Sequence, residues 1–155
     1  MAFIVVGLDG SQCSRKAFHE AVREATWRDA GLVVVHVVSY PVMSGYEFSA
    51  RIDLDALLSR GDKLLEDELA ILESEYDGSF PVAVERRVVM GHTGVEMMRA
   101  ANGEGRDDGE TAELVVLGSR GYGGFRGLML GSVTTYAAHH LSCALLVVPA
   151  DSTED

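Results

Sequence analysis

Apolar residues along the chain follow two kinds of pattern, and the two kinds alternate. Continuous apolar runs are typical of strands buried on both faces, and they cover residues 3–8, 32–38, 113–117 and 144–149. A fifth strand is predicted at 82–89, where charges in the centre indicate a more exposed place in the sheet. Between the strands, apolar residues recur at helical spacing over residues 17–25, 54–72, 94–101 and 133–141. Strict alternation predicts an α/β domain in which helices cover both faces of a doubly wound, parallel five-stranded sheet.

Two stretches have no clear period and are predicted to be loops, residues 39–53 and residues 103–110. The first contains Tyr40, Tyr46 and Phe48. These aromatic side chains could cover a bound ligand or face a partner, and the sequence leaves both alternatives open.

Length and composition are those of one folded domain. The chain has 155 residues, of which 47% are hydrophobic, enough for a core. We predict one domain over residues 1–150 and a disordered acidic tail at 151–155. No run approaches the ~18 apolar residues of a membrane span, and the N-terminus does not resemble a signal peptide, so we expect a cytoplasmic protein without a membrane partner.

The charge balance narrows the classes of partner. The formal net charge is −11, from 24 acidic and 13 basic residues, and this argues against a nucleic-acid partner. Cys13 and Cys143 are too few for a disulfide framework, and the five histidines are too scattered for a metal site. His140 lies on the apolar stripe of its segment and is predicted to be a core residue.

Six glycines are concentrated in "GSRGYGGFRGLMLGS", residues 118–132, between a predicted strand and a predicted helix. Ligands of doubly wound sheets bind beyond the carboxyl ends of the strands, so this stretch lies on the binding edge. Gly131 and Ser132 open the helix, whose first N–H groups attract phosphate, and Ser132 could cap it or donate to a phosphate oxygen. The stretch has no lysine, which excludes a P-loop, and no G-x-G-x-x-G follows the first strand.

One spacing in this stretch is specific: Gly118 and Gly121 form G-x-x-G, and after nine residues Gly131 and Ser132 form G-S. It resembles the nucleotide motif of the universal stress protein family, ATP-binding subclass. The stretches "IVVGLDGS", "VVHVV", "VVMGHTG" and "HLSCALLVVP" are similar to other parts of that family, so the resemblance covers nearly the whole chain. It implies strand order 3-2-1-4-5 and a homodimer formed through residues 144–149.

The resemblance also implies a set of ATP-binding residues, with Mg²⁺ carried on the phosphates. Asp9 would lie near adenosine and phosphates, and the main chain of Val37 would meet adenine. The remaining positions line the edge after the first strand, form the turn at ribose and phosphates, or open the phosphate-binding helix: Gly7, Leu8, Leu117, Gly118, Arg120, Gly121, Gly131, Ser132, Val133 and Thr134.

Function is predicted to be nucleotide-dependent regulation of an unidentified protein partner, because no nucleophile–base pair is recognisable at the binding edge. A slow ATP-hydrolysing enzyme and a nucleotide-free structural dimer are the alternatives. Individual residues also have simpler interpretations. The glycines could be turn residues, Asp9 could cap the first helix with Ser11, and Arg120 could be a solvated loop charge.

Overall fold

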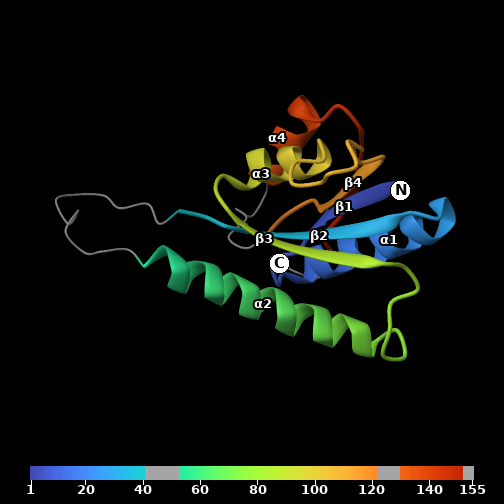
Figure 1. The fold of residues 1–155 in the computed structure, drawn as a ribbon, viewed down its shortest axis with the longest axis horizontal. Coiled ribbons are helices and arrows are strands. Elements are labelled where there is room, and N and C mark those ends of the chain that lie inside the picture. Colours follow the sequence, from blue (N-terminus) through green and yellow to red (C-terminus); the bar gives the residue numbers. More distant parts are fainter. Residues whose placement is uncertain (41–52, 122–129, 152–155) are drawn as a thin grey trace.

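The computed structural model describes residues 1–40, 53–121 and 130–151, and in it five strands and four helices alternate along the chain (Figure 1). The strands are β1 (Phe3–Gly7), β2 (Gly31–Val38), β3 (Val84–Met90), β4 (Leu114–Gly118) and β5 (Ala144–Val148). The helices are α1 (Gln12–Arg28), α2 (Leu54–Ser74), α3 (Thr93–Ala101) and α4 (Ser132–His140).

All neighbouring strands are parallel, and the sheet order is β3-β2-β1-β4-β5. The predicted fold class and strand order are therefore confirmed. Ile4 of β1 lies opposite Leu32 of β2 and Leu114 of β4, which fixes the register in the centre of the sheet. Helices α1 and α2 cover one face, and α3 and α4 cover the other (Figure 1).

Two hydrophobic layers hold the helices to the sheet because successive strand residues point to opposite faces. Ile4 and Val6 pack with Phe18 of α1 and Leu65 of α2, whereas Val5 packs with the α3–α4 side. The side chain of Phe18 is completely buried, and burial of a residue of this size stabilises a fold by about 2 kcal/mol. The alternating layers explain why β1 must be apolar at every position.

The two edge strands differ in character. In β3, Glu85 and Arg86 are exposed, which agrees with the predicted exposed position of this strand, although it begins at Val84 rather than at 82. In β5 the central residues are apolar and only half-buried. The strand ends at Val148, because Pro149 has no N–H to continue the ladder.

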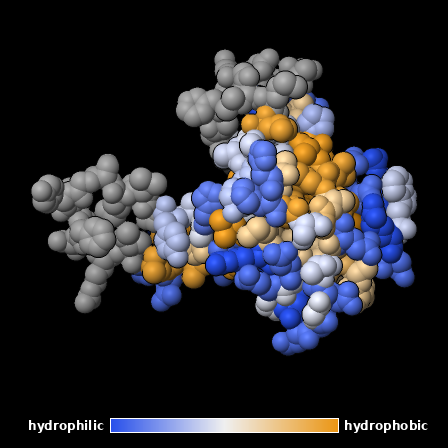
Figure 2. Space-filling view, turned by 90° about the horizontal axis from the view of Figure 1, so that it is seen from above, coloured by the Kyte–Doolittle hydropathy of each residue, from blue (hydrophilic) through white to orange (hydrophobic). Residues whose placement is uncertain are grey.

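One core prediction is wrong. His140 is exposed at the end of α4, where its imidazole stacks on the ring of Tyr136 at 4.0 Å between centroids. The buried residues of this short helix are Thr134 and Ala137, so its buried stripe ends before His140, the last helical residue. On the face seen from above, Figure 2 shows a larger hydrophobic area in the upper middle and smaller ones elsewhere.

Asp151, the first residue of the predicted acidic tail, contacts helix α1. Asp151 forms an ion pair with Lys16, 2.6 Å between Nζ and Oδ1, and residues 152–155 of the predicted tail lie outside the described residues. Within the described ranges, no helix combines the length and apolar character needed to cross a bilayer.

Candidate functional site

A cleft of about 520 Å³ opens at the carboxyl ends of the strands. It lies where the strand order reverses, with β2 on one side of β1 and β4 on the other. All twelve residues predicted for the site line it: Gly7, Leu8, Asp9, Val37, Leu117, Gly118, Arg120, Gly121, Gly131, Ser132, Val133 and Thr134. Residues far apart in the sequence are thus brought to one place.

Asp9 is held by the first turn of α1. Its Oδ1 accepts hydrogen bonds from the backbone N–H of Ser11 at 2.9 Å and from the Ser11 hydroxyl at 2.6 Å. Ser11 is the N-cap of α1 and accepts from the N–H of Ser14 at 3.2 Å. Asp9 therefore stabilises the cap of α1 while lining the cleft, and the two interpretations of this residue are compatible.

Gly118 at the end of β4 and Gly121 in the turn that follows have no room for side chains. A Cβ atom on Gly118 would lie 2.7 Å from the Sγ of buried Cys13, and one on Gly121 would lie 2.8 Å from the Oδ2 of Asp9. Real Cβ contacts essentially never come this close. The G-x-x-G spacing therefore reflects close approach of the end of β4 to the first turn of α1, and of the turn after β4 to the β1–α1 turn.

The start of α4 forms the other wall. Gly131 is the N-cap and has no side chain to bond the first helical N–H groups, and the first residues of the helix line the cleft. Ser132 is exposed at the first helical position, so the suggested capping role for its hydroxyl is wrong. Thr134 is buried, and its hydroxyl donates to the carbonyl of Gly118 at 2.9 Å, which ties α4 to the end of β4.

A third contact closes the glycine-rich turn. The N–H of Gly131 donates to the carbonyl of Ser119 at 2.6 Å, and the N–H of Ser119 donates to the carbonyl of Val148 at 2.8 Å. The hydroxyl of Ser119 also accepts from the N–H of Ala150 at 3.1 Å. Residues 122–129 of the glycine-rich stretch, and 41–52 of the loop with Tyr46 and Phe48, lie outside the described residues.

Five residues that line the cleft were not predicted: Ser14, Val35, Ser39, Thr93 and Met97. Thr93 and Met97 belong to α3, whose apolar spacing is the same whether a residue faces a core or a cleft. Val35 is two residues before Val37 on β2 and so points to the same face, which is a signal that the sequence contained. Val35, Val37, Met97 and Leu117 belong to one hydrophobic cluster and form an apolar part of the cleft lining.

Charge in the cleft is sparse. Of the described lining residues, Asp9 and Arg120 carry charge, and the remaining polar side chains are serines and threonines. The described part of the chain contains no group of three or more histidine, cysteine, aspartate or glutamate residues placed to hold a metal ion. An anion at this site would depend on Arg120 and on the N–H groups at the start of α4.

Comparison with known proteins decides the family. The sequence matches the universal stress protein family over residues 3–149. The chain belongs to the universal stress protein family. It is 34% identical over 130 residues to universal stress protein Rv2623 of Mycobacterium tuberculosis, covering 84% of this chain and 39% of that protein. The chain thus spans about two fifths of the length of this curated relative.

Solved universal stress proteins have the same fold. The structure of UspA from Lactobacillus plantarum matches with a TM-score of 0.76 at 22% identity, over 95% of this chain and 97% of that one. A universal stress protein solved in complex with cAMP matches at a TM-score of 0.57 and 24% identity, over 96% of both chains. One from Archaeoglobus fulgidus in complex with dAMP matches at 0.54 and 17%, over 96% and 98%.

Proposed function

We propose that this universal stress protein domain binds ATP in the cleft at the carboxyl edge of the sheet and acts as a nucleotide-dependent regulator. The observation that carries the proposal is that the twelve residues implied by the family resemblance all line one cavity. Its volume of about 520 Å³ lies within the range of small-molecule sites, roughly 300–1,000 Å³.

The lining of the cleft suits both the base and the phosphates of a nucleotide. The apolar lining that includes Val37 and Met97 offers a surface to a purine ring, and the start of α4 offers N–H groups to phosphates. Arg120 adds a positive charge on the phosphate side. Since Asp9 is the one carboxylate among the described lining residues, Mg²⁺ would be held mainly by the phosphates themselves.

Two relatives support an adenine nucleotide in particular, because they were solved with cAMP and dAMP.

The residues that line the cleft argue for nucleotide binding over catalysis. Phosphoryl transfer needs a base or a residue that positions water, and the polar lining residues supply hydroxyl groups and one carboxylate already bonded to Ser11. Slow hydrolysis remains the alternative that kinetics would reveal. The cytoplasmic location stays a prediction.

We also propose that the domain forms a homodimer through β5. Leu145, Leu146 and Val147 are half-buried in one protomer, and the strand lies at an edge of the sheet. An apolar edge offers unpaired backbone groups to another chain, whereas the charged residues of β3 discourage pairing at the opposite edge. Antiparallel pairing of two copies about a two-fold axis would cover the exposed apolar edge.

Mass spectrometry of the small molecules released on denaturing the purified protein tests the binding proposal. Co-purified ATP, or ATP taken up by nucleotide-free protein, is the expected result. Protein that neither retains nor takes up an adenine nucleotide would instead support a structural dimer with an unused cleft.

A further inference from the structure

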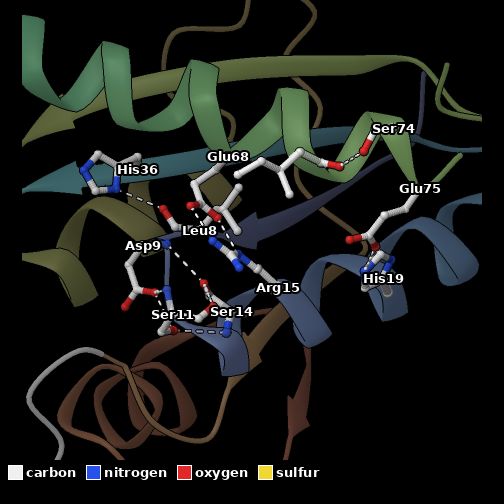
Figure 3. A network of polar contacts seen from close by, with 11 residues as sticks. Leu8, Asp9, Ser11, Ser14, Arg15, His19, His36, Glu68, Ser74 and Glu75 are labelled. Carbon is white, nitrogen blue, oxygen red and sulfur yellow. Dashed lines mark hydrogen bonds and ion pairs between the residues drawn. The ribbon is translucent and has the colours of Figure 1, made fainter. Parts of the chain in front are cut away.

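Side chains hold both polar atoms of one peptide group at the floor of the cleft. The peptide joins Leu8 to Asp9, directly after β1, and both residues line the cleft. Its carbonyl oxygen lies 2.9 Å from Nδ1 of His36, and its N–H donates to the hydroxyl oxygen of Ser14 at 3.3 Å (Figure 3). The orientation of this peptide determines where the Asp9 side chain starts.

The contact at the carbonyl assigns the protonation of the imidazole. A carbonyl oxygen only accepts hydrogen bonds, so Nδ1 of His36 must carry the proton. His36 does not line the cleft: neighbouring Val35 and Val37 face it, and His36 points to the opposite face of β2, toward α2. The imidazole of His36 therefore acts on the cleft through its hydrogen bond to Leu8 and not by contact with a bound nucleotide.

Helix α2 holds the ring in this orientation. A Cβ atom on Gly61 would lie 3.3 Å from Cδ2 of His36 and 2.6 Å from Cγ2 of Val38, so the helix backbone packs directly on the edge of the imidazole. The same helix also binds α1 beside Ser14, the residue whose hydroxyl accepts the hydrogen bond from the Asp9 N–H. Glu68, which is buried, accepts two hydrogen bonds from Arg15 at 2.7 and 2.8 Å, next to Ser14 in α1 (Figure 3).

We propose that His36 is a positioning residue of the nucleotide site: its Nδ1–H fixes the Leu8–Asp9 peptide and, through it, the Asp9 carboxylate. The inference rests on the proposed nucleotide binding and adds to it a residue on the far face of the sheet. It makes α2 the support of the cleft floor, although no residue of α2 lines the cleft.

Two substitutions that place a side-chain N–H at different distances from the backbone test the positioning role of His36. The side-chain nitrogen of asparagine occupies about the place of Nδ1, so His36→Asn should keep the bond to Leu8 and hold ATP affinity within about twofold of wild type. In His36→Gln the amide reaches past that place, and affinity should fall by about fivefold, the loss expected for one hydrogen bond. Isothermal titration with Mg²⁺-ATP measures both, and thermal unfolding measures the stability of each variant.

A residue with only a structural role would give a different result. If the two variants bind ATP equally well, or lose affinity equally, the positioning role is wrong, whatever their stabilities. A second measurement uses the unsubstituted protein: the ¹⁵N chemical shifts of His36 should report a proton on Nδ1, and a proton on Nε2 alone would overturn the inference. Wild-type protein that fails to bind ATP but has the Nδ1 proton would count against the proposed function and not against the peptide clamp.

Discussion

The Oδ2 atom of Asp9 lies 2.8 Å from the place that a Cβ atom of Gly121 would occupy. The two residues come from the turns after β1 and β4, the neighbouring strands at which the sheet order reverses. Their contact makes one continuous wall from two turns that are more than a hundred residues apart. Gly121 is required here because the carboxylate is held at Oδ1 by Ser11 and cannot turn away without losing those hydrogen bonds.

Replacement of Gly121 by alanine should therefore weaken nucleotide binding more than it weakens the fold. The new methyl group must displace the Asp9 carboxylate, and we expect ATP affinity to fall about tenfold, which corresponds to ~1.4 kcal/mol. Gly31→Ala is the matched control, because a Cβ atom there would meet its nearest neighbours at an ordinary 3.8 Å. Equal ATP affinities for the two variants by calorimetry would show that the Asp9–Gly121 contact does not shape the site.

Turnover of ATP should be incidental. With the Asp9 carboxylate engaged by Ser11, the lining residues that the structure describes offer no base, and we expect hydrolysis far below ~10 per second, a median enzyme rate. Release of phosphate from Mg²⁺-ATP over hours measures it. A rate near the median value that Asp9→Asn abolishes would identify an enzyme instead.

The dimer proposal predicts a specific effect in β5. Val147→Pro would remove the backbone N–H of a central residue of the strand and obstruct pairing, so light scattering at micromolar concentration should shift from dimer toward monomer. Val147→Thr retains the N–H and the branched shape, and it should remain dimeric. A monomeric wild-type protein, or a dimer that Val147→Pro leaves intact, would place the interface elsewhere or exclude it.

The loop after α3 predicts a pH effect on stability. Arg106 contacts Asp108 at 2.6 Å and Glu85 at 3.0 Å and lies 4.2 Å above the ring of Phe3, which fastens the loop to the sheet. The hydrogen bond from Arg106 lowers the pKa of Asp108 from 3.8 to about 2. The stability from this pair is then fully present above pH 3.8 and is lost as the pH falls toward 2.

Urea unfolding at a series of pH values tests this sign. Asp108→Asn should lower the unfolding midpoint at neutral pH, and its difference from wild type should shrink between about pH 4 and pH 2. Asp107→Asn changes the adjacent carboxylate, which takes part in none of the described ion pairs, and serves as the control. A constant difference across this range for Asp108→Asn would mean that the carboxylate charge does not stabilise the loop.

The sequence predicted the fold well because four of the strands had a continuous apolar run and each helix a spaced apolar stripe. The resemblance supplied the strand order, and it supplied the site because glycine spacing records close contacts such as that of Gly118 with Cys13. Met97 was missed because a buried methionine gives the same pattern in a core and in a cleft wall. The bond from His36 to Leu8 could not be predicted, since one histidine in a strand does not indicate which atom its Nδ1 will meet.

The central claim is that the start of α4 and the glycine turn form the phosphate side of an ATP site. Its most direct test is a calorimetric titration of nucleotide-free protein with Mg²⁺-ATP, for the wild type, for Gly131→Glu and for the control Gly31→Ala. A glutamate at Gly131 would place a side chain and a negative charge at the proposed phosphate seat, with the carbonyl of Ser119 only 3.3 Å from its Cβ. The account predicts one site in the wild type and in the control, and at least a ~tenfold loss of affinity in folded Gly131→Glu. Unchanged affinity in that variant, or no binding in the wild type, would contradict it.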